Sequence, residues 1–391
     1  MLLLLNQFFL PDIAATAQLL GDFAASSAEM GYEVTVIAAD TEYGSRTSRV
    51  CYNPHLTVRR TGTLGFGRST FVRLGSYTAY LLSATRLAWS CVDADLLLTL
   101  TTPPMLSFVG MITRRKAPHY IWEMDVYPDV AYALDYIRPN RLLSWLLDVP
   151  RHRAAGIIAL GECMRERLLG HGIDPGKIHV IENWADGELI RPLPMPSRGG
   201  MLRVLYSGNL GLAHEYQTVL DVIPETRDVH FTFAGGGAHQ SKFKNLPNTE
   251  IGPYCSLDGL GEHLAQCHIG LVTQLPTTLG CVVPSKSYGL MAAGRPILFI
   301  GPRQSTVARN IEKFQCGWNF ECGDSAGVVA LLNHLQVHRE EIEEAGRNAR
   351  VAFEANFDRP IAMAKFAKVL GLERLGAADE AVRGAGSVAA V

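Results

Sequence analysis

Short apolar runs rich in leucine and β-branched residues alternate along the chain with longer segments whose apolar positions recur at helical spacing. The first unit shows the rhythm. The run Leu2–Leu5 is followed by Ile13, Ala17 and Leu20 on one helix face, and Gly31 marks the end of that helix. A repeated order of strand, helix and strand predicts a parallel sheet with helices on both faces.

The same pattern runs through both halves of the chain. In the first half it predicts strands at Leu2–Leu5, Glu33–Ile37, Leu56–Arg60, Leu96–Leu100, His119–Trp122, Gly156–Leu160 and Lys177–Ile181. In the second half it predicts strands at Arg203–Tyr206, His230–Ala234, Thr249–Gly252, Ile269–Val272, Pro296–Ile300 and Gly317–Phe320. Two closing helices are expected at Arg339–Ala355 and Arg359–Leu370.

A break in the pattern divides the chain. The stretch "RPLPMPSRGG", residues 191–200, is too rich in proline and glycine to continue a helix or a central strand. The predicted fold class is therefore α/β, with two Rossmann-like doubly wound domains that face each other across a cleft. The predicted parts are an N-terminal domain (1–190), this linker, a C-terminal domain (201–355), a helix (356–375) that can cross back to the N-terminal domain, and a disordered tail (376–391).

Composition narrows the class of protein. The 391 residues are 48% hydrophobic and 19% charged, which is typical of a globular chain, and the net charge of -2 argues against bulk binding of nucleic acid. The eight cysteines form no CxxC pair, which favours reduced thiols in a cytosol; Cys316 and Cys322 are two small core residues or, alternatively, a metal pair. The opening "MLLLLNQFF" lacks the features of a signal peptide, and no run reaches the ~18 apolar residues of a membrane span.

Three loops of the second half follow predicted strands, at the sheet edge where α/β proteins bind ligands. "YSGNLGLAHEYQT" carries Gly208 and Gly211, "AGGGAHQ" is rich in glycine, and "VVPSKSYGLMAAGRPI" places Lys286 at a helix start after Pro284. Glycines admit a close ligand, and a lysine beside free helix N–H groups suits a phosphate. The alternatives are ordinary turn glycines and a solvated surface lysine.

The first half offers weaker candidates. Asp125, in "WEMDVYPD", follows a predicted strand and can take or orient the proton of a substrate hydroxyl, or it is a structural cap or ion-pair partner. Glu123 is more typical of a structural position. Asn183 lies near the predicted hinge, and Asp12 and Thr16 flank the first loop, where helix capping is as good an interpretation as ligand contact.

Basic residues gather in one part of the first half. Eight Lys and Arg residues and two acidic residues lie between residues 59 and 120, together with the long apolar stretch "LGSYTAYLLSATRLAW". The segment from Arg59 to Trp89 therefore predicts an interfacial helix on anionic lipid, with an ordinary core helix as the alternative.

Several of these stretches resemble, in order, those of GT-B-fold glycosyltransferases of the large retaining family four, in the bacterial branch that builds lipopolysaccharide, capsule or exopolysaccharide. The matching stretches are "FFLPDIAATAQLLGDFA", "WEMDVYPDVA", "VIENWAD", "VLYSGNLGLAHEYQTVL", "TFAGGGA", "VPSKSYGLMAAGRPILFIGP" and "CGWNFECGD", which span nearly the whole chain. The resemblance implies a nucleotide-diphosphate sugar donor in the C-terminal domain and an acceptor in the N-terminal one. It also implies transfer with retention and no required metal.

The predicted site combines the loops with the resemblance. Asp125 is the predicted catalytic residue. The predicted donor-binding residues are Gly208, Asn209, Leu210, Gly211, Gly235, Gly236, Pro253, Tyr254, Pro284, Ser285, Lys286, Ser287 and Tyr288. The predicted acceptor-side residues are Pro11, Asp12, Ala15, Thr16, Glu123 and Asn183.

The chain also departs from the family pattern. Cys281 and Gly289 stand where many members carry two glutamates. Many members also carry an arginine and a lysine in the first loop, where this chain has Asn209 and, nearby, His214 and Glu215. Residues 14–15 are alanines in place of a glycine pair. Lys286 can supply part of the missing positive charge.

These observations predict a retaining glycosyltransferase for polysaccharide biosynthesis that uses a UDP- or GDP-type sugar and a lipid-linked, polysaccharide or small-molecule acceptor. The protein is expected in the cytoplasm, peripheral on the inner membrane face, with no metal and no nucleic-acid partner. Two alternatives remain. A nucleotide-sugar epimerase would need an acid and histidine cluster in the cleft, and a non-catalytic partner would explain why both glutamates are missing.

Overall fold

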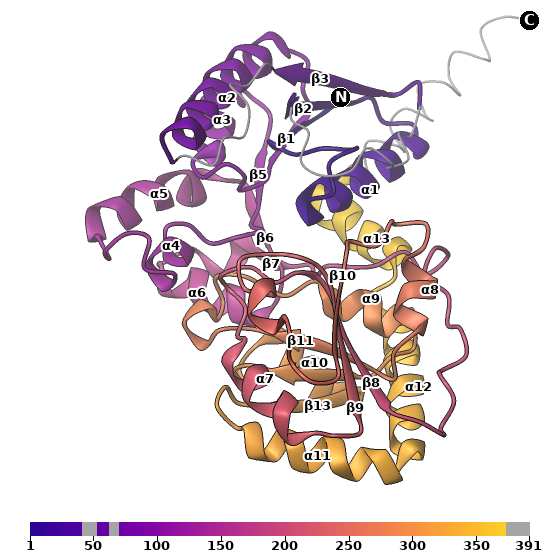
Figure 1. The fold of residues 1–391 in the computed structure, drawn as a ribbon. Helices are drawn as coiled ribbons and strands as arrows, with labels where there is room; N and C mark the ends of the chain where they lie inside the picture. The colour runs from indigo at the N-terminus through magenta and orange to yellow at the C-terminus, as the bar shows by residue number, and fades with distance from the viewer. Residues whose placement is uncertain (41–52, 62–69, 373–391) are drawn as a thin grey trace, which may run out of the picture.

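The structure, a computed structural model, describes residues 1–40, 53–61 and 70–372, and only the backbone of residues 70–74. The chain forms two α/β parts, which lie one above the other in Figure 1. Each part is a parallel sheet covered by helices, so the α/β fold class with two doubly wound domains is confirmed.

The N-terminal sheet has seven parallel strands in the order β3-β2-β1-β4-β5-β6-β7. They are β1 (Leu2–Leu5), β2 (Val34–Ala39), β3 (Leu56–Thr61), β4 (Leu96–Thr99), β5 (His119–Trp122), β6 (Gly156–Ala159) and β7 (Ile178–Val180). The inner strands β1, β4 and β6 are buried along their whole length, because helices cover both faces, and this explains their unbroken apolar sequences. The helices of this part are α1 (Ala15–Glu29), α2 (Thr70–Ser90), α3 (Leu106–Thr113), α4 (Asp129–Ala133), α5 (Arg141–Arg153), α6 (Glu162–Gly170) and the 3-10 turn η1 (Pro175–Lys177).

The C-terminal sheet has six parallel strands in the order β10-β9-β8-β11-β12-β13. They are β8 (Leu202–Asn209), β9 (Val229–Gly236), β10 (Thr249–Gly252), β11 (Ile269–Thr273), β12 (Ile297–Ile300) and β13 (Gly317–Phe320). The helices are α7 (Gln217–Val222), α8 (Leu260–Ala265), α9 (Lys286–Ala292), α10 (Thr306–Phe314), α11 (Ser325–Val337), α12 (Arg339–Asn356) and α13 (Arg359–Leu370). Three 3-10 turns complete this part: η2 (Ile223–Glu225), η3 (Gln240–Phe243) and η4 (Pro276–Thr278).

The chain crosses between the N-terminal and C-terminal parts twice. Ile190 lies before the proline-rich stretch, yet it packs in the C-terminal core, so the chain leaves the N-terminal core just after Trp184, earlier than the prolines indicate. At the other end, α13 returns to the N-terminal core. There the Phe366 ring lies 4.7 Å from the Trp122 ring and 5.8 Å from the Trp184 ring, centroid to centroid.

Some elements differ from the expected ones. β8 and β9 run on to Asn209 and Gly236, so the first two glycine loops begin inside strands. The pattern also gave no separate signal for α4 and α5, which follow β5. In α2, Tyr80, Ala84 and Ala88 are buried against the sheet, as in a core helix, while residues 62–69 of the predicted interfacial segment lie outside the described residues. Among the described helices, none combines the length and the hydropathy that a membrane crossing needs.

Candidate active site

The ends of β8 and β9 approach each other in a way that only glycine allows, and we refer to the region around these strand ends and the start of α9 as the crevice. Gly208 and Gly235 have φ angles of 118° and 132°, in the region that favours glycine. A Cβ atom on Gly235 would lie 2.3 Å from the Gly208 carbonyl oxygen, and a Cβ atom on Gly208 would lie 2.9 Å from Cε of Lys286. The two strand ends therefore approach each other more closely than larger residues would allow, and the Lys286 side chain lies directly against Gly208.

Lys286, the first residue of α9, reaches across this floor to neutral groups. Its Nζ donates to the Asn209 carbonyl oxygen at 3.2 Å and lies 3.4 Å from Nε2 of His214 and 5.0 Å from the centre of the Tyr206 ring. Among the described residues no carboxylate pairs with it. Burial lowers the pKa of Lys286 to about 8, because the surroundings disfavour the charged form.

His214 helps to hold this lysine. Its Nδ1 lies 2.9 Å from the Thr273 carbonyl oxygen, so Nδ1–H donates there and Nε2 is left to accept from the Lys286 ammonium group. Burial and, secondly, the Lys286 charge lower the pKa of His214 to about 3, which keeps the ring neutral. The sequence gave His214 no role, because its link to Lys286 exists only after folding.

The other predicted donor residues fall into two groups. Asn209, Gly211, Gly236, Pro253, Tyr254 and Ser285 lie at or near the crevice and are at least partly exposed. Tyr254 stands over Gly236, where an added Cβ atom would lie 3.0 Å from its ring. The second group points inward and is buried: Leu210, Pro284, Ser287 and Tyr288. Tyr288, for example, packs its ring 5.2 Å from that of Phe357 in the C-terminal core, so the structure does not bring its side chain to the crevice.

Asp125 lies in the N-terminal part at its boundary with the C-terminal part. Its backbone N–H and that of Met124 both donate to Oγ1 of Thr101, each at 3.1 Å, which fixes the turn after β5. The next residue, Val126, donates its N–H to the Cys281 carbonyl oxygen of the C-terminal part at 2.9 Å. Burial and, secondly, the charge of Glu123 raise the pKa of Asp125 to about 6. The carboxylate is therefore ionised at neutral pH but is a better base than an ordinary aspartate.

Glu123, a predicted acceptor-side residue, has a structural position instead. It is buried, and Arg151 binds it through Nε at 2.6 Å and Nη2 at 3.3 Å. Arg151 also donates to Oδ1 of Asp148 at 2.7 Å. The ion pair engages both oxygens of Glu123 in the interior of the N-terminal part, away from solvent. The two carboxylates raise the pKa of Arg151 above its usual value.

A charged chain continues from this pair to the other part of the molecule. His171 contacts Asp148 through Nδ1 at 2.8 Å and Asp129 through Nε2 at 3.0 Å, and these bonds raise its pKa to about 9, so it donates to both. Arg167 binds Asp129 at 2.7 Å and donates to the Leu279 carbonyl oxygen across the domain boundary at 2.8 Å. The sequence gave His171 no role, since its two partners are distant along the chain.

The remaining acceptor-side candidates surround the end of β1. Oδ2 of Asp12 accepts from the Phe9 N–H at 3.3 Å, so this carboxylate shapes the turn before α1 and does not cap that helix. Pro11, Ala15 and Thr16 are at least partly exposed along the same segment. Asn183 is buried, and in the described part of the chain its Oδ1 accepts no hydrogen bond.

The predicted metal alternative does not form. Cys316 and Cys322 direct their sulfur atoms to different carbonyl oxygens, those of Asn310 and Gln274. Within residues 1–40, 53–61 and 70–372, a group with the spacing of a metal site occurs between α11 and α12, away from the crevice, and consists of His334, His338 and Glu341.

Two doubly wound parallel sheets joined in one chain are typical of the GT-B class of fold, and solved structures agree. A sucrose-phosphate synthase from Thermosynechococcus elongatus aligns with a TM-score of 0.77 at 12% identity, over 96% of this chain and 99% of that one. HepE from Anabaena, solved in complex with UDP-glucose, aligns with a TM-score of 0.72 at 14% identity, over 95% of this chain and 99% of that one.

Sequence comparison adds the family. Residues 16–184 match the model of the glycosyl transferase 4-like domain. The relative named "Probable glycosyltransferase WbjE", from Pseudomonas aeruginosa, is 25% identical over 314 residues, which are 74% of this chain and 78% of that protein. Together the comparisons support a GT-B-fold glycosyltransferase of family four, as the resemblance implied, with the family's domain matched in the N-terminal part of the chain.

Proposed function

We propose that this glycosyltransferase moves a sugar, with retention of configuration, from a UDP- or GDP-type donor to a lipid-linked or polysaccharide acceptor. The observation that carries the proposal is Lys286. Its ammonium group lies beside the backbone of β8, and among the described residues all of its hydrogen-bond partners are neutral. A partly buried cation without an acidic partner is costly, and a diphosphate supplies the missing charge.

The comparisons support the donor class. HepE of Anabaena, whose fold matches that of this chain, has been solved with UDP-glucose. The crevice here offers features that suit such a molecule: Lys286 for the diphosphate, the partly exposed glycine backbone at Gly208 beside it, and the half-exposed Tyr254 ring, on which a base can stack.

The proposed reaction breaks the bond between the sugar carbon and the diphosphate oxygen, and the electron pair stays on the diphosphate. The acceptor oxygen bonds to the same face of that carbon, and its proton passes to the departing phosphate. Lys286 stabilises the growing negative charge, which is the largest effect that such a site can provide. Asp125, ionised at neutral pH, orients the acceptor hydroxyl from the opposite part of the molecule.

Two further features belong to the proposal. No divalent ion is required, because Lys286 and the backbone N–H groups at the strand ends carry the positive charge that a metal otherwise supplies. The protein acts in the cytoplasm, at the inner face of the membrane, where both a nucleotide sugar and a lipid-linked acceptor are available.

The purified protein tests the proposal directly. We expect a thermal shift with UDP or GDP, and slow release of free sugar from the matching nucleotide sugar, because retaining transferases let water replace the acceptor. Nucleotide binding without release or transfer, across a broad panel of donors and acceptors, would instead favour the non-catalytic partner. A changed sugar on an intact nucleotide would favour the epimerase.

A further inference from the structure

Helix α5 is inverted relative to an ordinary surface helix. Its charged residues Asp148 and Arg151 face inward and are buried in the ion-pair chain with Glu123 and His171. Its apolar residues face outward at helical spacing: 70% of Leu142 and 64% of Trp145 is exposed. A helix in water turns its polar face outward, so this face calls for an apolar partner.

Neighbouring elements extend the exposed apolar surface. Leu146 of α5 and Ile112 of α3 are exposed, and so is Trp89 at the end of α2. α3 packs against both α2 and α5, so the three helices form one side of the N-terminal part. Tyr136 and Ile137, in the loop that leads into α5, are exposed as well. We call this set of residues the α5 face. In Figure 1 α5 stands at the outer edge of the molecule on this side.

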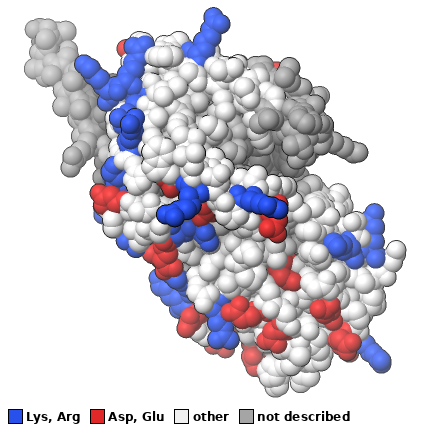
Figure 2. Space-filling view, turned by 90° about the vertical axis from the view of Figure 1, so that its left-hand side faces the viewer, with Lys and Arg blue, Asp and Glu red and all other residues white. Residues whose placement is uncertain are grey.

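Basic residues border the α5 face at both ends. Arg138 and Arg141 are exposed where α5 begins, and Arg153 is exposed where it ends. Figure 2, which views this side, shows Lys and Arg side chains around a broad uncharged area of the N-terminal part. Asp93 and Asp135 are exposed nearby, but Asp95 is bound to the N-terminal ammonium group.

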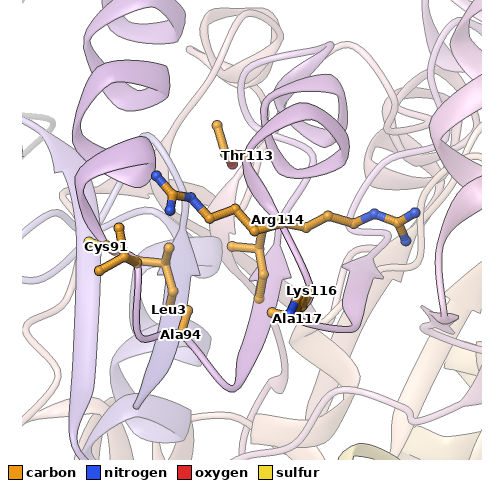
Figure 3. A pocket seen from close by; sticks show the side chains of 10 residues that line it. Leu3, Cys91, Ala94, Thr113, Arg114, Lys116 and Ala117 are labelled. Carbon is orange, nitrogen blue, oxygen red and sulfur yellow. The ribbon is translucent and has the colours of Figure 1, made fainter.

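The segment after α3 gathers further charge between the helix ends. Arg114 donates to the Arg153 carbonyl oxygen at 3.1 Å, and Arg115 donates to the Trp89 carbonyl oxygen at 3.2 Å. Together with Lys116 they line a hollow of about 230 Å³ whose opposite wall includes Leu3, Cys91 and Ala94 (Figure 3). Basic groups around an apolar hollow suit a phosphate group attached to a hydrocarbon chain.

We propose that the α5 face, with its border from Arg114 to Lys116, is the surface by which this protein lies on an anionic lipid bilayer. The apolar side chains enter the headgroup boundary, and the arginines and lysine meet lipid phosphates. The inference rests on the proposed action at a membrane and specifies its site. The membrane contact therefore lies at α5 and not in the predicted segment Arg59–Trp89, because α2 buries its own apolar face against the sheet.

Helix α4 connects the acceptor side of the site to the α5 face. The chain runs from Asp125 through α4 directly into α5, and Tyr132 of α4 is fastened to the start of α5 by a bond to the Asn140 carbonyl oxygen at 2.9 Å. In this proposal a lipid-linked acceptor approaches Asp125 from the side of the N-terminal part that carries α5.

Vesicle flotation tests the proposal without any sugar transfer. The wild-type protein should float with vesicles of equal parts phosphatidylglycerol and phosphatidylcholine, float poorly with phosphatidylcholine alone, and lose binding in high salt. Trp145→Glu and Leu142→Glu should each lower partitioning at least tenfold. Replacing both Arg115 and Lys116 by Gln should lower it by roughly fivefold per charge, the effect expected for a basic residue near an anionic surface.

Matched controls come from the other part of the molecule. Val337 is 77% exposed on α11 and Arg303 is exposed before α10, so Val337→Glu and Arg303→Gln repeat the same chemical changes far from the α5 face. Both should leave vesicle binding unchanged. All variants should keep the wild-type thermal shift with UDP, which verifies folding and tests the proposed donor site separately.

Two results would overturn the inference. One is flotation that responds equally to the α5 variants and to their controls, or to neither. The other is a stable dimer of the lipid-free protein, seen in light scattering, that Trp145→Glu dissociates, because a second copy of the chain would then cover the α5 face.

Discussion

Replacement of Lys286 by methionine removes one positive charge from the crevice and keeps most of the side-chain volume. The lysine has no acidic partner in the described structure, so its loss breaks no ion pair and the fold should survive. A hydrogen bond from a charged group contributes about 1.5–3 kcal/mol. Lys286→Met should therefore raise the Kd for UDP or GDP by roughly ten- to a hundredfold.

The low pKa of Lys286 gives this prediction a second readout. In the free protein the pKa is about 8, so the ammonium form is present below this pH and the neutral amine above it. A bound diphosphate favours the ammonium form, hence binding takes up a proton above pH 8. The affinity of the wild-type protein should fall as pH rises beyond this value, by up to about tenfold per pH unit. The methionine variant should lack that dependence.

Calorimetry at several pH values measures both effects on one preparation. Lys313→Met is the matched control, because Lys313 also lies over an aromatic ring, that of Phe314 at 4.7 Å, but on α10 and outside the crevice. Equal nucleotide affinity of the wild-type protein and Lys286→Met, at every pH, would refute the assignment of Lys286 to the diphosphate.

Three further predictions concern catalysis, metal and stability. Asp125→Asn should lower the rate of sugar transfer by ~10²-fold or more without changing nucleotide affinity. The wild-type rate should fall as pH drops below about 6, because Asp125 then takes up a proton. A variant with nearly the wild-type rate would show that Asp125 has only a structural role. EDTA should leave transfer unchanged, and a loss that Mg²⁺ or Mn²⁺ restores would contradict the metal-free mechanism. Arg151→Met should lower the free energy of unfolding, measured in urea at neutral pH, by about 3–5 kcal/mol, because the buried Glu123 carboxylate loses its ion-pair partner. This loss of stability should become smaller in acid. Unchanged stability would show that water enters the site.

The alternation of apolar runs and helical patterns predicted most of the fold because parallel strands buried on both faces carry an unbroken apolar signal. The point at which the chain changes part was less visible. Proline and glycine mark residues 191–200 as irregular, but Ile190 packs in the C-terminal core for reasons of tertiary contact alone. The sequence pattern did not predict helix α5 for a related reason: its buried side is polar and its apolar side faces outward.

The same distinction applies to the candidate site. Glycine and lysine after predicted strands are local signals, and they identified Gly208 and Lys286. The partners that fix them are not local: His214 reaches Lys286, and Thr101 holds the backbone of Asp125, only after two strand ends meet. Glu123 illustrates the opposite outcome. A carboxylate after a strand can be a ligand-binding or a structural group, and only its ion pair with Arg151, which is distant along the chain, shows that it is structural.

The structure also gives a physical reason for the cysteine at position 281. Its side chain is buried at the domain boundary, and its carbonyl oxygen accepts from the Val126 N–H. Burial raises the pKa of Cys281 to about 11; the Arg167 charge opposes this rise, and the charges of Asp129 and Asp125 add to it. A glutamate here would bring a third carboxylate beside two others in a partly dry space, and like charges at such distances disfavour ionisation of at least one of them. Arg167 is already engaged by Asp129 and the Leu279 carbonyl oxygen. A carboxylate at the crevice is therefore compatible with the N-terminal side, at Asp125, or with position 281, but poorly with both at once.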